Sequence, residues 1–236
     1  MKKLLKFFAL LVLLIVAVTL FKTRTFKSVQ IQAKAAQVRP LDQQILAGHL
    51  ARALTYRTIS YQDSAKFNPQ PFLAFQAFLE QTFPLLHQHL QKEVVNRYSL
   101  LYTWPGSNPR LQPALLMAHQ DVVPVGKETM NKWEYPAFAG QIEQGYVWGR
   151  GAMDDKASLI AICEAVEYLL KTGFQPQRTL YLAFGHDEEI GGAQGAVHIA
   201  RLLQKRGLSL AYVLDEGGGM MDGMMPGIDR PVAMVG

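Results

Sequence analysis

The chain has 236 residues, of which 49% are hydrophobic and 18% are charged; this is the composition of a folded domain and excludes a disordered chain. The formal net charge is +5, but many of the basic residues behind this excess lie in the N-terminal segment, so the charge indicates a membrane surface. No later run interleaves basic with aromatic residues, which argues against a nucleic-acid partner.

An apolar run from Phe7 to Phe21 opens the chain, with lysines before it and Lys22 and Arg24 after it. Together with the two leucines that precede it, the run extends over about 18 residues, enough for one membrane-spanning helix. Small residues do not follow the apolar core, which favours an uncleaved anchor over a removed signal peptide. Residues 1–26 are therefore predicted to be an anchor or signal, and residues 27–40 a polar linker.

Periodicity in residues 41–236 predicts an α/β domain. Apolar residues at helical spacing predict helices at residues 41–59, 71–83, 155–171 and 193–205, and short apolar runs predict strands at residues 94–104, 114–118, 146–148, 179–184 and 211–214. This alternation favours a largely parallel sheet flanked by helices on both faces. Cys163, the only cysteine, lies in a predicted helix, where we expect a buried thiol and no internal disulfide.

Acidic and histidine side chains follow the predicted strands. They are His119 and Asp121, then Asp154 and Asp155, then Glu188 and Glu189, and last Asp215 and Glu216. Ligands bind at the carboxyl edge of an open α/β sheet, so we expect these groups to share one crevice. Each pair has an ordinary explanation, such as a hydrogen bond at a strand end or a solvated loop, but four coincidences are needed to explain them all.

Several carboxylates in one crevice repel one another unless a cation lies among them. Histidine nitrogen together with carboxylate oxygen suits zinc, and two metals that share a bridging carboxylate are an established means of activating water. The strand ends therefore predict a metal centre.

Three segments carry a resemblance to a known family. Residues 116–124, 148–156 and 183–192 resemble, in order and in spacing, the signature blocks of the carboxypeptidase S and aminoacylase type of zinc-dependent exopeptidases. The resemblance begins near Leu41 and continues to the end of the chain. It implies a zinc exopeptidase-like fold, with residues 41–236 as the N-terminal part of the catalytic domain.

The resemblance also implies a role for each site residue. His119 and Asp215 would bind one zinc ion, Glu189 the other, and Asp154 would bridge the two; cobalt or manganese could replace zinc. Asp121 would orient the His119 ring, and Glu188 would be the general base. The peptide bond after the bridging Asp154 is often cis in this family. His186 matches no ligand position and is expected to be a supporting loop histidine.

The expected reaction is metal-dependent hydrolysis of an amide or peptide bond next to a free carboxylate, in a peptide or an N-acyl amino acid. The alternative is a non-catalytic relative that keeps the fold and acts as a binding module. Relatives of this type continue into a lid domain and a last zinc-binding histidine, so we expect this polypeptide alone to be weakly active or inactive, and a homodimer only where a lid is present. The catalytic part is expected to be exported (periplasmic, extracellular or lumenal) on a membrane anchor, or secreted if the N-terminal segment is cleaved.

Overall fold

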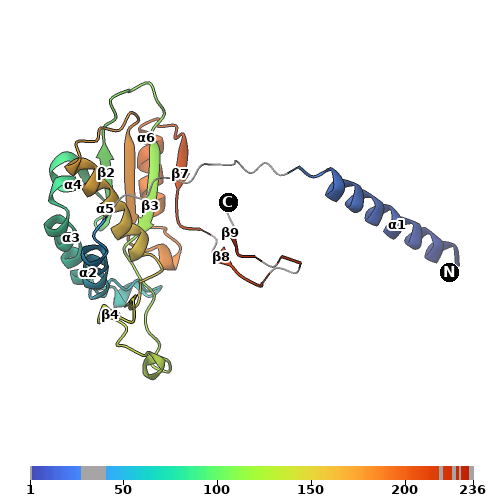
Figure 1. The fold of residues 1–236 in the computed structure, drawn as a ribbon, viewed down its shortest axis with the longest axis horizontal. Helices are drawn as coiled ribbons and strands as arrows, with labels where there is room; N and C mark the ends of the chain where they lie inside the picture. Colours follow the sequence, from blue (N-terminus) through green and yellow to red (C-terminus); the bar gives the residue numbers. More distant parts are fainter. Residues whose placement is uncertain (1, 28–40, 218–219, 225–226, 229, 234–236) are drawn as a thin grey trace. The chain divides into compact units, whose positions relative to one another are not determined.

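The computed structural model describes residues 2–27, 41–217, 220–224, 227–228 and 230–233 (Figure 1). The chain divides into two compact units, Met1–Pro40 and Leu41–Gly236. Most of the predicted linker lies outside the described residues. In the first unit, α1 (Lys2–Thr25) buries none of its residues and is long and apolar enough to cross a membrane. Its 24 residues extend over about 36 Å, more than the thickness of a bilayer core.

The second unit begins with a group of helices. Helix α2 (Gln43–Leu54) starts at Asp42, whose Oδ1 accepts hydrogen bonds from the backbone N–H groups of Gln44 and Ile45. It ends before the predicted residue 59, because the chain from Thr58 onward lies extended beside Val122. The 3-10 turn η1 (Ser64–Lys66) and helix α3 (Gln70–Thr82) follow. A short helix that periodicity did not predict, α4 (Pro84–His89), begins at Pro84.

Five strands form the main sheet, in the order β1-β2-β6-β3-β7. Strand β2 is antiparallel to both of its neighbours, whereas β3 is parallel to both β6 and β7, so every strand except β2 points the same way. This arrangement confirms the α/β prediction. The strands are β1 (Gln91–Val95), β2 (Ser99–Trp104), β3 (Ala114–His119), β6 (Leu180–Gly185) and β7 (Tyr212–Leu214).

Two details of the sheet differ from the sequence prediction. The single run at residues 94–104 is a hairpin, because Asn96 and Arg97 adopt positive φ angles of 45° and 78° and reverse the chain between β1 and β2. The strand β5 (Tyr146–Trp148) does not join the main sheet. It pairs with β4 (Gln141–Glu143) in a separate two-stranded sheet.

The remaining described elements carry or follow the site loops. They are η2 (Met130–Lys132), α5 (Lys156–Lys171), η3 (Glu188–Ile190), α6 (Ala196–Lys205), β8 (Met220–Met221) and β9 (Val232–Ala233), the last two forming a second separate hairpin. The run at residues 155–171 was thus predicted correctly to within one residue.

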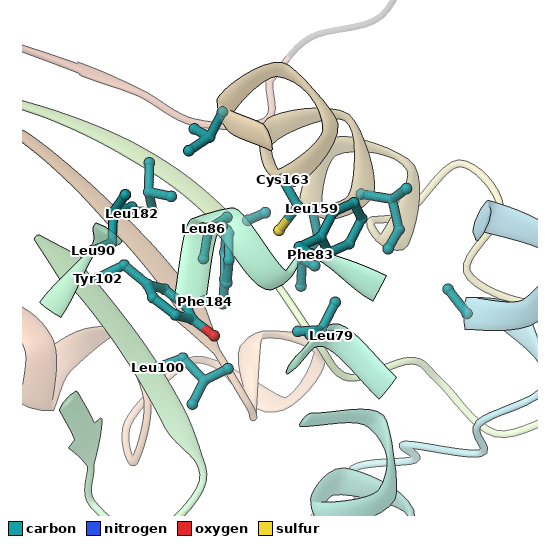
Figure 2. Close-up of a cluster of buried hydrophobic side chains, with 14 of the residues drawn as sticks. Leu79, Phe83, Leu86, Leu90, Leu100, Tyr102, Leu159, Cys163, Leu182 and Phe184 are labelled. Carbon is teal, nitrogen blue, oxygen red and sulfur yellow. The ribbon is translucent and has the colours of Figure 1, made fainter. Parts of the chain in front are cut away.

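Helices lie on both faces of the sheet (Figure 1). The side chains of the strands alternate between two apolar clusters, one on each face. On one face Leu100, Tyr102 and Phe184 pack against α3, α4 and α5, and Cys163 is part of this cluster (Figure 2). On the other face Leu101 belongs to a second cluster, which is covered by α6. Because both faces of the central strands β2, β3 and β6 are largely buried, the polar groups lie in the loops at the strand ends.

Candidate metal centre

His119 is the last residue of β3, and it is buried with 2% of its surface exposed. Its Nδ1 lies 3.0 Å from the backbone oxygen of Asp121 and 3.2 Å from the Oδ1 of that residue. Both partners are acceptors, so Nδ1 carries the hydrogen and donates it. This hydrogen bond fixes the orientation of the ring and directs Nε2 toward the other carboxylates.

Asp121 is fully buried and holds several parts of the site together. Besides the His119 ring, it accepts hydrogen bonds from the hydroxyl of Ser60 and from the backbone N–H groups of Glu188 (3.0 Å) and Glu189 (3.2 Å). Burial by itself would raise the pKa of Asp121, but the hydrogen bonds from His119 and Ser60 lower it. Asp121 is therefore expected to remain an anion. Its contact with Nδ1 of His119 is the one that its predicted orienting role requires.

Asp154 lies opposite the free nitrogen of the histidine, with its Oδ1 2.8 Å from His119 Nε2. The peptide bond between Asp154 and Asp155 is cis, as the family resemblance implied. Asp155 is buried, and its Oδ2 accepts a hydrogen bond from the backbone N–H of His119 at 3.2 Å. The two adjacent aspartates thus contact the same histidine, one at its ring and one at its backbone.

The loop after β6 brings two glutamates to the same place. Glu188 Oε2 lies 3.8 Å from His119 Nε2, and half of the Glu188 side chain is exposed. The Oε1 of Glu189 accepts a hydrogen bond from the backbone N–H of Val123, in the loop after β3, at 3.2 Å. Burial, and then the negative charge of Asp154, raise the pKa of Glu189.

The segment after β7 contributes Glu216, which the strand-end pattern places in the crevice but to which the family resemblance assigns no ligand role. Its Oε1 lies 3.5 Å from His119 Nε2, and one ligand atom each from His119, Asp154 and Glu216 lie within 4.8 Å of one another. A cavity of about 240 Å³ lies beside this group and is lined by His119, Glu216 and Asp215. Asp215 also accepts a hydrogen bond from the backbone N–H of Glu216. Successive side chains of an extended segment point in opposite directions, so one of two adjacent carboxylates approaches the ring more readily than the other.

The electrostatics of this cluster suit a cation. Burial would lower the pKa of His119, but Asp121, with Asp154 and Glu216, raises it to about 10. Burial and then the neighbouring Asp155 raise the pKa of Glu216 to about 7. These shifts mean that the cluster recruits protons to offset its negative charge, and a divalent cation among one imidazole and several carboxylates would provide the same compensation.

Histidines outside this cluster have structural partners. His186 is buried, with its Nδ1 2.6 Å from the hydroxyl of Ser99, and it packs edge-on against the ring of Tyr98. His49 pairs with Glu164 on α5. The contacts of His186 agree with the supporting role expected from the sequence.

A largely parallel α/β sheet with an imidazole and carboxylates at its carboxyl edge defines an α/β protein with a candidate metal centre. Comparisons with known proteins identify the family. Residues 115–229 match the family described as Peptidase family M20/M25/M40. The chain belongs to this family, and within it to the carboxypeptidase S and aminoacylase type.

Among similar curated proteins, "Probable carboxypeptidase S-like 2" of Dictyostelium discoideum is 45% identical over 81% of this chain and 37% of its own length. "N-fatty-acyl-amino acid synthase/hydrolase PM20D1" of Mus musculus is 43% identical over 79% of this chain and 37% of its own length. "Carboxypeptidase S" of Saccharomyces cerevisiae is 49% identical over 64% of this chain and 27% of its own length. The chain thus spans between 27% and 37% of the length of these three curated relatives.

Solved structures agree on the fold. Human carnosine dipeptidase 1 superposes with a TM-score of 0.59 at 18% identity, over 74% of this chain and 38% of that chain. The metallo-carboxypeptidase Sso-CP2 of Sulfolobus solfataricus gives a TM-score of 0.57 at 23% identity, over 76% of this chain and 38% of that chain.

Proposed function

We propose that this chain forms the metal-binding part of an enzyme that hydrolyses an amide bond next to a free carboxylate. One observation carries the proposal: the Nε2 atom of His119 faces carboxylates from three separate segments, Asp154 at 2.8 Å, Glu216 at 3.5 Å and Glu188 at 3.8 Å. A buried imidazole among carboxylates is a donor set that zinc prefers.

The proposed ligand roles are those that the family resemblance implies, and the cluster around His119 supports them for His119 and Asp154. We assign His119, Asp154 and Glu189 to a pair of zinc ions, with Asp154 between them. The fourth ligand is either Asp215, which the resemblance implies, or Glu216, whose Oε1 lies 3.5 Å from His119 Nε2. Asp121 keeps Nδ1 of His119 protonated, so that Nε2 is free to bind a cation.

Glu188 is the proposed general base. Its carboxylate lies 3.8 Å from His119 Nε2 and lines the cavity, and half of its side chain is exposed. Bound zinc would supply Lewis acidity to water and to the amide carbonyl. Glu188 would take a proton from the attacking water and pass it to the leaving nitrogen.

The relatives suggest the substrates and the location. Their names describe carboxypeptidases and a synthase/hydrolase of N-fatty-acyl amino acids, so we propose a peptide with a free C-terminus or an N-acyl amino acid as substrate. Helix α1 would anchor an exported catalytic part in the membrane, or direct its secretion if it is cleaved.

Metal content tests the proposal. The purified chain is dialysed against zinc, and bound metal is counted by mass spectrometry for the wild type, Asp154→Asn and Glu188→Gln. We expect zinc in the wild type, a loss of zinc in Asp154→Asn, and full zinc in Glu188→Gln. Because this polypeptide alone is expected to be at most weakly active, zinc content is the primary readout; any hydrolysis of an N-acyl amino acid by the wild type should fall about a hundredfold or more in Glu188→Gln.

Glu143→Gln, on the exposed hairpin strand β4, is the matched control and should match the wild type in zinc content and in any hydrolysis. The metal centre is refuted if the wild type and Asp154→Asn bind the same amount of zinc. A parallel comparison of Asp215→Asn with Glu216→Gln decides which residue is the fourth ligand, because only the ligand variant should lose zinc.

A further inference from the structure

Residues 56–60, here called the connecting segment, link α2 to η1 and run beside the loop that follows His119. The hydroxyl of Thr58 donates to the backbone oxygen of Gln120 at 2.6 Å, and the backbone N–H of Val122 donates to the oxygen of Thr58 at 2.9 Å. Ser60 donates to the carboxylate of Asp121. Thr58 and Ser60 are both buried. The connecting segment thus holds the histidine side of the centre by three hydrogen bonds.

The same segment also holds the aspartate side, through Lys156. This lysine is the first residue of α5 and follows Asp154 and Asp155 directly. Its ammonium group donates to the backbone oxygen of Tyr56 at 2.6 Å and to that of Ala53 at 3.0 Å. The side chain has no exposed surface, and its Nζ lies 4.9 Å from the ring centre of Phe75.

A buried lysine is a costly way to fill space. Burying an ammonium group is strongly unfavourable unless it is well paired, and an apolar side chain of similar length would fill the same volume without that penalty. At Ala53 and Tyr56 the lysine meets carbonyl groups at the C-terminal end of α2, where the helix dipole favours a cation. What the lysine adds over an apolar residue is a fixed attachment between the start of α5 and the connecting segment.

We propose that Lys156 and Thr58 are positioning residues that hold Asp154 and His119 at ligand spacing through their shared attachment to the connecting segment. Asp154 and His119 are 35 positions apart in the sequence and come from different elements. Lys156, two residues after Asp154, and Gln120, next to His119, each bond to the connecting segment, so the distance between the two ligands does not depend on their direct contact alone. Preorganised ligands avoid the loss of binding energy that is otherwise needed to assemble a site.

Zinc affinity of the whole chain tests this inference, which rests on the metal centre proposed above. Affinity is measured by competition with a chelating dye for the wild type, Lys156→Met, Lys156→Arg and Thr58→Val. Residues that support metal ligands commonly contribute ten- to a hundredfold in affinity, so we expect a loss of about that size in Lys156→Met and Thr58→Val. Lys156→Arg keeps a cationic donor and should recover part of the loss.

A second readout separates positioning from general stability. Cobalt is added at saturation, and its visible spectrum reports the arrangement of the ligands; we expect altered bands in Lys156→Met although the metal-free protein keeps its circular dichroism spectrum. Lys171→Met, in the last turn of the same helix, is the matched control and should match the wild type in both measurements.

The inference is overturned if folded Lys156→Met binds zinc within twofold of the wild type with an unchanged cobalt spectrum. If Lys156→Met does not fold, Thr58→Val decides, because it is nearly isosteric and contacts none of the proposed ligands directly: wild-type affinity there also overturns the inference. Wild-type protein that binds no zinc would instead refute the metal centre itself, and this inference with it.

Discussion

At the scale of single residues, Asp121 is a buried carboxylate that orients several groups of the site although it is not itself a proposed metal ligand. It contacts the His119 ring, the Ser60 hydroxyl and the backbone of Glu188 and Glu189. Its hydrogen bonds outweigh the cost of burial and lower its pKa. The charge of Asp121 thus serves the ring and the glutamate loop at once.

Replacing Asp121 with asparagine should weaken zinc binding about ten- to a hundredfold, the usual effect of removing such a partner. The amide keeps the shape of the carboxylate but removes its negative charge. Its nitrogen is a donor, so it cannot replace the second carboxylate oxygen as an acceptor of the hydrogen bonds that Asp121 receives. A zinc competition titration measures the effect. Asp63→Asn, at the exposed cap of η1, should bind zinc like the wild type. Equal affinities of Asp121→Asn and wild type would contradict the orienting role.

At the scale of elements, an ion pair joins β1 to the helix that covers the second face of the sheet. Arg206, at the end of α6, binds Glu93 with both nitrogens, at 2.9 Å and 2.6 Å. The hydrogen bond from Arg206 lowers the pKa of Glu93 in the folded chain. The pair is about one-third exposed, so water and salt screen it and its contribution is small.

Arg206→Ala should lower the free energy of unfolding by about 0.2–1 kcal/mol at pH 7. Because the pKa of Glu93 is lower in the folded than in the unfolded chain, the contribution is present above the ordinary glutamate pKa of 4.5 and is lost as pH falls through the folded value. Urea unfolding of both proteins at a series of pH values measures this. A difference that grows toward acid pH would show that the assigned cause is wrong, and Arg201→Ala on the same helix serves as control.

At the scale of the whole molecule, the chain consists of two units that suit different surroundings: a lipid bilayer for the first and water for the second. None of the residues of α1 is buried, whereas the second unit contains two apolar clusters on opposite faces of its sheet. The apolar side chains of α1 could therefore be buried in a bilayer, whereas those of the second unit are buried in its own core.

Removing residues 1–40 should leave the thermal midpoint of the second unit unchanged to within about 2 °C, because a loss of 1 kcal/mol would move the midpoint of a domain of this size by at least that much. Binding to phospholipid vesicles, measured by co-sedimentation, should disappear. A large fall in the midpoint would show that the first unit contributes to the fold. Vesicle binding that survives the deletion would place the membrane contact elsewhere.

The sequence by itself determined the class of fold, the places where the chain leaves the sheet, and most of the candidate site. These features depend on local periodicity and on short blocks of residues, such as the one around His119 and the one that ends at Glu189. The hairpin turn at Asn96 and Arg97 was missed because its two strands read as one apolar run.

Only the tertiary structure decided which groups meet. The approach of Glu216 to His119 depends on the direction of the chain after β7, and the attachments of Thr58, Ser60 and Lys156 join segments that lie far apart in the sequence. A pattern along the chain records which side chains are apolar and where a strand ends. It contains no distance between segments, since that distance is fixed by the packing of the sheet and its helices.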